Sequence, residues 1–329
     1  MQSLKNKLSP IITTDPIYGK VKITSPLILE LLNSKDIIRL KKISQFGVPD
    51  KYYHLKKFSR YQHSLGVYIL LNKLGASEIE QAAGLLHDIS HTAFSHVYDW
   101  IKGNKAEEHS QDETHKTFLP KSDVGKILKK HLINPVKISK LTSFKLLETE
   151  IPNLCADRID YALREFPLVI ARKCFNNLCV KNKKIVFKNE EIALIFAKNF
   201  LLKQDLHWGG FEAVARYAIF GKVLKIALEK NIIRQSDFWE KEEAIIIKKL
   251  IDSKNSKIKQ YLNILTKKSL KNLKRGKEIR YKKFRYVDPL FLKNGKILRL
   301  SLNNLKFKHL LKETKQENLK GVFIPILTE

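Results

Sequence analysis

The stretch Ala82-Ala83-Gly84-Leu85-Leu86-His87-Asp88-Ile89-Ser90-His91 decides how this chain folds and what chemistry it can carry. A histidine here directly precedes an aspartate, while His63 lies upstream and Asp157 downstream. Imidazole nitrogens and carboxylate oxygens together suit borderline to hard divalent cations, and two of each leave coordination positions open for water and a substrate oxygen. The pattern therefore predicts a catalytic metal site formed by His63, His87, Asp88 and Asp157.

A single histidine-aspartate pair is equally well explained by a buried histidine beside a capping aspartate. Further polar residues at helical spacing favour the metal site. His87 and His91 are four residues apart and share one face if the helix continues, and His96 and Asp99 follow one turn apart. Asp157 is likewise followed by a tyrosine four residues later. Coincidence does not account well for all of these features together.

The order His, His-Asp, Asp resembles the HD-domain phosphohydrolases. Within that superfamily the chain is most similar to the deoxynucleoside triphosphate triphosphohydrolase branch. The likeness covers roughly residues 15 to 170 and includes Pro26 to Gly47, the residues around His63, His87 to Asp99, and Asp157 to Glu165. The resemblance implies a helical core that holds one divalent metal ion, with Mn, Mg, Fe, Ni and Zn all open as its identity.

The resemblance also implies an acid-base group, for which histidine is suited because it titrates nearest neutrality. His96, Asp99 and His115 match the positions of that group, and His91 is a further candidate because of the titration range of histidine alone. His96 is the first choice as the acid that protonates the leaving group, and His115 is preferred over the nearby His109. The other histidines are expected to have ordinary surface or core roles: His54, His131, His207 and His309.

Five residues are implied as substrate contacts. Arg60 and Arg158 would contact phosphates, and Tyr161 would stack on or bond the sugar. Gln45 would bond the ribose 3′-hydroxyl, and Glu165 matches an acidic position that accepts from the same hydroxyl. The family residue at that last position is usually aspartate, so the extra methylene of glutamate leaves the choice between ribose and deoxyribose open.

These assignments predict a metal-dependent phosphohydrolase that splits (deoxy)nucleoside triphosphates into nucleoside and triphosphate. Two alternatives remain. One is an HD nucleotidase or phosphodiesterase that acts on monophosphate, cyclic or oligonucleotide substrates. The other is a nucleic-acid-binding regulatory HD protein without turnover, against which the intact set of four metal ligands argues.

The apolar spacing predicts a mainly α protein, in which an HD-domain helical core precedes a small C-terminal α+β appendage. A length of 329 residues allows about two domains. We expect an HD phosphohydrolase domain over residues 1–205, a helical extension over 206–265 and a basic α+β region over 266–329. Helical spacing near 3.6 runs through Leu27–Leu40, Ser64–Leu74, Ile79–Leu86, Val124–His131, Asp157–Leu163 and two later stretches at Glu190–Lys230 and Glu240–Leu265.

Net charge and composition limit the classes of partner and the cellular compartment that we expect. The net charge of +29 suggests a nucleic-acid partner, but most of the 62 basic residues are lysines spread along the whole chain, which also fits an AT-rich genome or a nucleotide substrate. Three cysteines without a CxxC motif indicate a reducing compartment. We expect a cytoplasmic protein with no membrane segment. The resemblance and the apolar helix Phe211–Leu228 predict a homo-oligomer, either dimer or tetramer.

Overall fold

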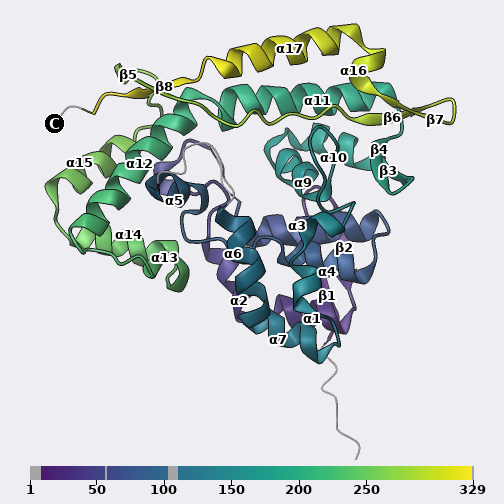
Figure 1. Cartoon of the computed structure of the whole chain (residues 1–329), viewed down its shortest axis with the longest axis horizontal. Coiled ribbons are helices and arrows are strands. Elements are labelled where there is room, and N and C mark those ends of the chain that lie inside the picture. Colours follow the sequence, from purple (N-terminus) through teal and green to yellow (C-terminus); the bar gives the residue numbers. More distant parts are fainter. Residues whose placement is uncertain (1–8, 56–57, 103–109, 328–329) are drawn as a thin grey trace, which may run out of the picture.

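The computed structural model describes residues 9–55, 58–102 and 110–327. The chain is mainly helical with a few small sheets, as the sequence predicts (Figure 1). It opens with the antiparallel hairpin β1 (Ile11–Asp15) and β2 (Gly19–Ile23), joined by a turn around Tyr18.

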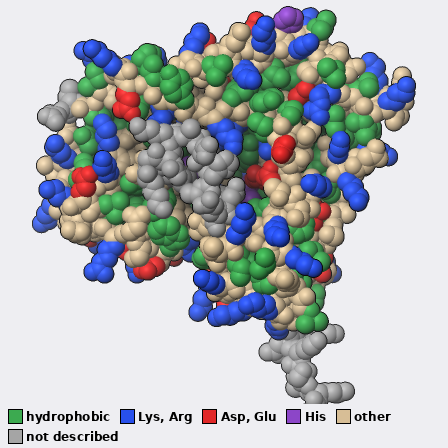
Figure 2. Space-filling model, viewed as in Figure 1, with side chains coloured by type: hydrophobic (Ala, Val, Ile, Leu, Met, Phe, Trp, Pro, Cys, Tyr) green, Lys and Arg blue, Asp and Glu red, His purple; other side chains and the backbone are tan. Residues whose placement is uncertain are grey.

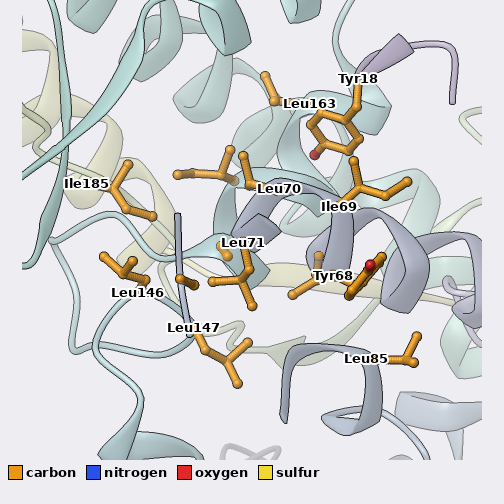
Figure 3. Packing of buried hydrophobic residues seen from close by; sticks show 14 of the residues in the cluster. Tyr18, Tyr68, Ile69, Leu70, Leu71, Leu85, Leu146, Leu147, Leu163 and Ile185 are labelled. Carbon is orange, nitrogen blue, oxygen red and sulfur yellow. The ribbon is translucent and has the colours of Figure 1, made fainter. Parts of the chain in front are cut away.

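The helical core is built on three helices that carry or adjoin the four predicted metal ligands. Helix α3 (Arg60–Lys73) packs against α4 (Glu78–Leu86) and α9 (Ala156–Glu165). A capping box fixes where α3 begins, because Ser59 accepts from the Gln62 amide and the Gln62 side chain accepts from the Ser59 amide. Apolar side chains of α3, α4 and α9 fill the interior between these helices (Figure 3).

Shorter elements surround this core. The helices are α1 (Pro26–Leu32), α2 (Lys35–Arg39), α5 (Ser95–Lys102), α6 (Ser110–Phe118), α7 (Asp123–Lys130), α8 (Pro135–Ile138) and α10 (Leu168–Asn176). Single 3-10 turns lie at η1 (Leu40–Lys42), η2 (Asp50–Tyr52), η3 (Leu119–Lys121) and η4 (Leu141–Ser143).

Two of the expected helices are interrupted. The stretch 27–40 breaks at Asn33, because Ser34 caps a new helix by accepting from the amide of Ile37 at 3.3 Å. The stretch 190–230 divides into α11 (Glu190–Lys203) and α12 (Phe211–Glu229), separated by the π-helical turn η5 (Gln204–Trp208) and two glycines. Local capping and turn geometry prevail over apolar spacing at both places.

A second apolar cluster lies beside the core. Helix α12 packs against α5 and α15 (Ser256–Leu265), and α14 (Glu243–Asp252) and the short α13 (Asp237–Glu240) complete this part. The apolar surface of α12 is thus buried within the chain. The apolar surface of this helix therefore no longer argues for an oligomer, and the predicted oligomer rests on the family resemblance alone.

The C-terminal residues are joined to the core by a shared sheet. Strands β3 (Leu178–Lys181) and β4 (Lys184–Phe187) form an antiparallel hairpin, with Asn182 and Lys183 both at positive φ in the turn. Strand β6 (Leu290–Lys293) pairs in parallel with β4, and β7 (Lys296–Arg299) completes the order β3-β4-β6-β7.

The rest of the C-terminal part lies along α11 and α12. Helix α16 (Leu300–Asn303) leads into α17 (Leu305–Leu319), which runs beside α11 (Figure 1). Strands β5 (Arg275–Arg280) and β8 (Val322–Pro325) pair with each other, and β8 contacts α12. The segment 281–287 between β5 and β6 crosses the body of the molecule and reaches the site described below.

Among the described residues, no helix is both long and apolar enough to cross a membrane. Lysine and arginine side chains are scattered over the face seen in Figure 2 and do not gather into one stripe there.

Candidate metal centre and its cavity

Three of the four predicted metal ligands, His63, His87 and Asp88, offer ligand atoms that all lie within 4.8 Å of one another, and Asp157 lies beside the two histidines. The Nε2 atoms of His63 and His87 lie 3.1 Å apart. Asp157 Oδ1 lies 2.9 Å from the first and 3.5 Å from the second. Asp88 Oδ1 lies 3.6 Å from His87 Nε2. His63 lies on α3 and Asp157 on α9, whereas His87 and Asp88 lie in the turn after α4.

The hydrogen bonds behind the two imidazoles show that the cluster fits a cation. His63 donates from Nδ1 to Asp160 Oδ2 at 2.7 Å, and His87 donates from Nδ1 to the Gly84 carbonyl at 2.7 Å. Each ring therefore presents Nε2 to the other ring and to the two carboxylates, and the neutral ring offers a lone pair there. The cluster needs positive charge between these atoms, which protons on the rings or a bound metal ion can supply. Helix α4 ends at Leu86, so the Gly84 carbonyl has no helical amide partner four residues on and can accept from His87.

The charges in the cluster also favour a bound cation. Burial alone would raise the pKa of Asp157, but hydrogen bonds with His63 and His87 outweigh it and hold that pKa below its ordinary value. Burial likewise opposes protonation of His63, yet its bonds to Asp157 and Asp160 raise its pKa to about 9. The carboxylates thus attract positive charge, which protons and a metal ion would compete to supply.

Asp160 is a supporting residue that the sequence analysis missed. It is fully buried and also accepts from Tyr18 Oη at 2.6 Å and from Arg164 Nε at 2.7 Å. Gly66 on α3 allows this approach, since a Cβ there would meet Asp160 Oδ1 at 2.1 Å. The available signal was the three-residue spacing from Asp157, which keeps both carboxylates on one side of α9.

Asp88 is held from two sides by residues given other roles in the sequence analysis. Arg60 is 1% exposed and donates to Asp88 Oδ2 at 2.6 Å and to Ser95 Oγ at 2.7 Å. His91 Nε2 lies 3.2 Å from Asp88 Oδ1. The condition that the helix continues from His87 to His91 is not met, because the chain turns after Leu86 and brings His91 back to Asp88.

A cavity of about 600 Å³ opens beside the cluster. Its walls carry the metal ligands His63, Asp88 and Asp157 together with the predicted residues Gln45, Arg60, His91, His96, Arg158 and Tyr161. Arg158 is held by backbone carbonyls, since Nη1 donates to Asn153 at 2.7 Å and Nη2 donates to Thr149 at 3.2 Å. Both bonds fix the guanidinium in the cavity wall.

A second, smaller pocket of about 110 Å³ adjoins this cavity. The two share four lining residues: Gln45, His96, Tyr161 and Arg285. Beyond them the smaller pocket is lined by Glu165 and by aromatic residues, namely Phe46, Tyr53, Phe58, His207, Trp208 and Tyr217. The three residues predicted to hold a sugar, Gln45, Tyr161 and Glu165, therefore line one pocket.

The predicted acid-base residues are placed differently from one another. His96 is half-buried, lines both spaces, and its ring centroid lies 5.5 Å from that of His91. Asp99 follows one turn later on α5, but its side chain lies outside the described part of the structure, as does all of His109. His115 is buried behind Ser90 and lines neither space.

Several lining residues were not predicted. Glu148 lines the larger space, where burial and the charge of Asp157 raise its pKa to about 7. Lys283, Phe284 and Arg285 come from the segment between β5 and β6, more than a hundred residues beyond the metal ligands. His207, expected to have an ordinary role, lines the smaller pocket. No spacing in the sequence links these residues to the histidine-aspartate pair.

Comparison with known proteins places this geometry in a family. Residues 60–163 match the HD domain family. The chain is 32% identical over 247 residues to the metal-dependent phosphohydrolase cns2 of Cordyceps militaris, with 71% of each chain covered. It is also 32% identical to the uncharacterized protein YdhJ of Bacillus subtilis, over 96% of this chain and 99% of that one. A shorter match, 32% over 103 residues, links it to human deoxynucleoside triphosphate triphosphohydrolase SAMHD1, covering 27% of this chain and 16% of that protein.

Proposed function

This chain belongs to the HD-domain family of metal-dependent phosphohydrolases, and we propose that it hydrolyses deoxynucleoside triphosphates to deoxynucleoside and inorganic triphosphate. The observation that carries the proposal is the junction of the two spaces. One space holds the proposed metal ligands with cationic side chains that include Arg158 and Lys283. The other holds mostly aromatic rings, with the Glu165 carboxylate and Lys282, and Arg285 lines both. A nucleotide has the same two halves, a polyphosphate and a nucleoside.

The four ligands His63, His87, Asp88 and Asp157 would hold one divalent ion, with Mn, Mg, Fe, Ni and Zn as candidates. When bound, such an ion polarises a phosphoryl oxygen and lowers the pKa of a water molecule. Arg158 would contact the phosphates, and Lys283 and Arg285 would add positive charge along the same wall. Arg60, predicted as a phosphate contact, already pairs with Asp88, so we propose that it mainly orients that ligand.

His96 lies where the phosphates and the sugar would meet. Water adds to the α-phosphorus, and the bond between that phosphorus and the 5′-oxygen breaks. His96 would donate a proton to the departing 5′-oxygen, so that the deoxynucleoside leaves with that proton and triphosphate remains. His91, whose pKa is lowered to about 3 by burial and by the charge of Arg60, would stay neutral beside it.

Gln45, Tyr161 and Glu165 would hold the sugar. Gln45 Oε1 is buried and has no hydrogen-bond partner within the described ranges, so it has unused bonding capacity at the pocket. The shorter match to a human deoxynucleoside triphosphate triphosphohydrolase, over 27% of this chain, supports this substrate class.

The direct test is a product analysis. Metal-loaded protein is incubated with dGTP, GTP, dGMP, a cyclic nucleotide and a short oligonucleotide, and the products are separated by chromatography. We expect deoxyguanosine and triphosphate from dGTP and a slower reaction with GTP. Orthophosphate as the sole product would contradict the cleavage site, and equal rates on dGTP and GTP would contradict the deoxy preference. Turnover of only the monophosphate, cyclic or oligonucleotide substrates would favour the alternative hydrolases. Asp88→Asn protein purified in parallel controls for contaminating phosphatases.

We further propose that the protein is a cytoplasmic homo-oligomer, on the family resemblance and the reduced cysteines alone. Light scattering at working concentration is expected to give the mass of a dimer or tetramer. A fully active monomer would contradict the proposed oligomer.

A further inference from the structure

The π-helical turn η5 carries two side chains that point at the same carboxylate. His207 donates from Nδ1 to Glu165 Oε2 at 2.6 Å, and Trp208 donates from Nε1 to Glu165 Oε1 at 2.8 Å. The extra residue of a π turn changes the direction of the side chains that follow, and such turns are frequent at functional sites. Here it allows consecutive residues to hold both oxygens of one glutamate.

A third residue fixes the histidine. Tyr53 donates its hydroxyl to His207 Nε2 at 2.6 Å, which leaves the imidazole proton on Nδ1, the atom that faces Glu165. Phe46 packs against the histidine edge-on at 4.8 Å between ring centroids. The ring is only 4% exposed, so its orientation is set by packing on its sides and by hydrogen bonds at both nitrogens.

The carboxylate held in this way remains able to accept more. Each oxygen of an ionised glutamate can take two hydrogen bonds, and His207 and Trp208 use one on each oxygen. Glu165 lines the small pocket together with Gln45 and Tyr161. Any donor that enters the pocket therefore meets an acceptor whose position is already fixed.

We propose that His207, supported by Tyr53 and Trp208, is a positioning residue that fixes Glu165 as the acceptor for the 3′-hydroxyl of the sugar and makes the enzyme selective for substrates that carry this hydroxyl. The proposal rests on the proposed function. Glutamate is longer than the aspartate usual at this position and has one more rotatable bond. The donors of η5 remove that freedom before the substrate binds, which lowers the entropic cost of binding.

The same arrangement predicts what the pocket rejects. A nucleotide without a 3′-hydroxyl would cover the carboxylate and offer no donor in place of water. Sites built around a substrate hydroxyl discriminate strongly against analogues that lack it, because a buried polar group is left without its partner. Selection at the 3′-position is therefore expected to depend on how firmly Glu165 is held.

The test compares two substrates on matched variants. Initial rates are measured with dGTP and with 2′,3′-dideoxyguanosine triphosphate on the wild type, His207→Leu, His207→Gln and Tyr53→Phe. We expect the wild type to favour dGTP by at least about 100-fold in kcat/KM. His207→Leu should lower kcat/KM for dGTP by about 10- to 100-fold and for the dideoxy substrate by less than about twofold. His207→Gln, which keeps an N–H donor, should recover part of the loss.

Controls separate positioning from folding. Tyr53→Phe removes a single hydroxyl and should show the same substrate-dependent loss, about two- to fivefold. Tyr52→Phe alters the neighbouring buried tyrosine, which lines neither space, and should leave both rates unchanged. Metal content should equal that of the wild type in every variant.

Two results would overturn the inference, and they can be told apart. Equal losses on both substrates in His207→Leu and Tyr53→Phe would show a merely structural role while leaving the proposed function intact. A wild type that is inactive on every nucleoside triphosphate would overturn the proposed function together with this inference.

Discussion

The metal centre and the small aromatic pocket are built in opposite ways. The metal ligands come from α3, the turn after α4 and α9, which pack directly on one another within residues 60–163. The pocket beside them draws its lining from segments that run from Gln45 to Arg285, including the turn between α11 and α12 and the C-terminal crossing segment. The chemistry is thus held by one compact unit, whereas the proposed substrate contacts depend on the assembly of almost the whole chain.

The largest expected effect comes from breaking the compact unit at Asp88. Asp88→Asn should abolish metal binding and reduce turnover at least about a thousandfold, because one of four ligands loses its charge. Metal content by plasma mass spectrometry and turnover of dGTP measure both. Asp88→Ala should in addition lower the free energy of unfolding by about 3–5 kcal/mol, since the buried Arg60 loses its carboxylate partner and keeps only neutral acceptors such as Ser95.

The exposed Asp252 on α14 offers a matched control, and Asp252→Asn should change neither quantity. Full metal occupancy in Asp88→Asn would show that Asp88 is not a ligand. The contrast between the two regions would then no longer hold.

The next effect tests the residue shared by both regions. His96→Ala should keep its metal and its KM but lose about 10²–10⁴-fold in kcat, the usual contribution of general acid catalysis. Steady-state kinetics on dGTP, with metal analysis of the same sample, measure it. His309→Ala, at an exposed histidine of α17, is the control. An increase in KM with unchanged kcat would move His96 from the reaction to the substrate pocket.

A third prediction concerns the interior behind the metal ligands. Burial lowers the pKa of His115 to about 4, whereas an unfolded chain titrates near 6.5. Between those values the unfolded state binds a proton that the folded state does not, so stability falls as the pH decreases from 7 to 5. The expected loss is about 2 kcal/mol at this one group. His115→Gln should remove that share from urea unfolding curves, and an unchanged pH dependence would show that His115 titrates normally.

The smallest expected effect concerns a proposed substrate contact from the C-terminal part of the chain. Arg285→Gln should raise KM for dGTP about tenfold with little change in kcat, because a wall residue outside the metal unit contributes binding rather than chemistry. Lys296→Gln alters an exposed cation of the same C-terminal part and should have no effect. A fall in kcat at constant KM would instead place Arg285 with the reacting groups.

The two regions also differ in how far sequence could predict them. The closeness of the four proposed metal ligands could be predicted because each lies in a helix or beside its end, where spacing and a known motif apply; that they bind a metal stays a prediction. The break at Asn33 and Ser34 could not be predicted, since a serine cap prevails there over apolar periodicity. His207 gave no signal, because its role depends on a π turn and on Tyr53, which is 154 positions away. Arg285 is held at the site by contacts distant in the sequence, such as the bond of its backbone amide to Gln204 Oε1 at 3.2 Å. The substrate, the oligomer and the cellular location stay predictions.

The position of the crossing segment has a consequence for the life of the protein on the ribosome. The metal ligands are complete once residue 157 has emerged, while Arg285 follows 128 positions later. At about 5–20 residues per second, the growing chain carries a finished ligand set for about 6 to 26 seconds before the wall can close. During that interval the lining of the smaller pocket lacks Lys282 and Arg285. We therefore expect that synthesis from the N-terminus lets a metal ion bind before the substrate pocket is complete.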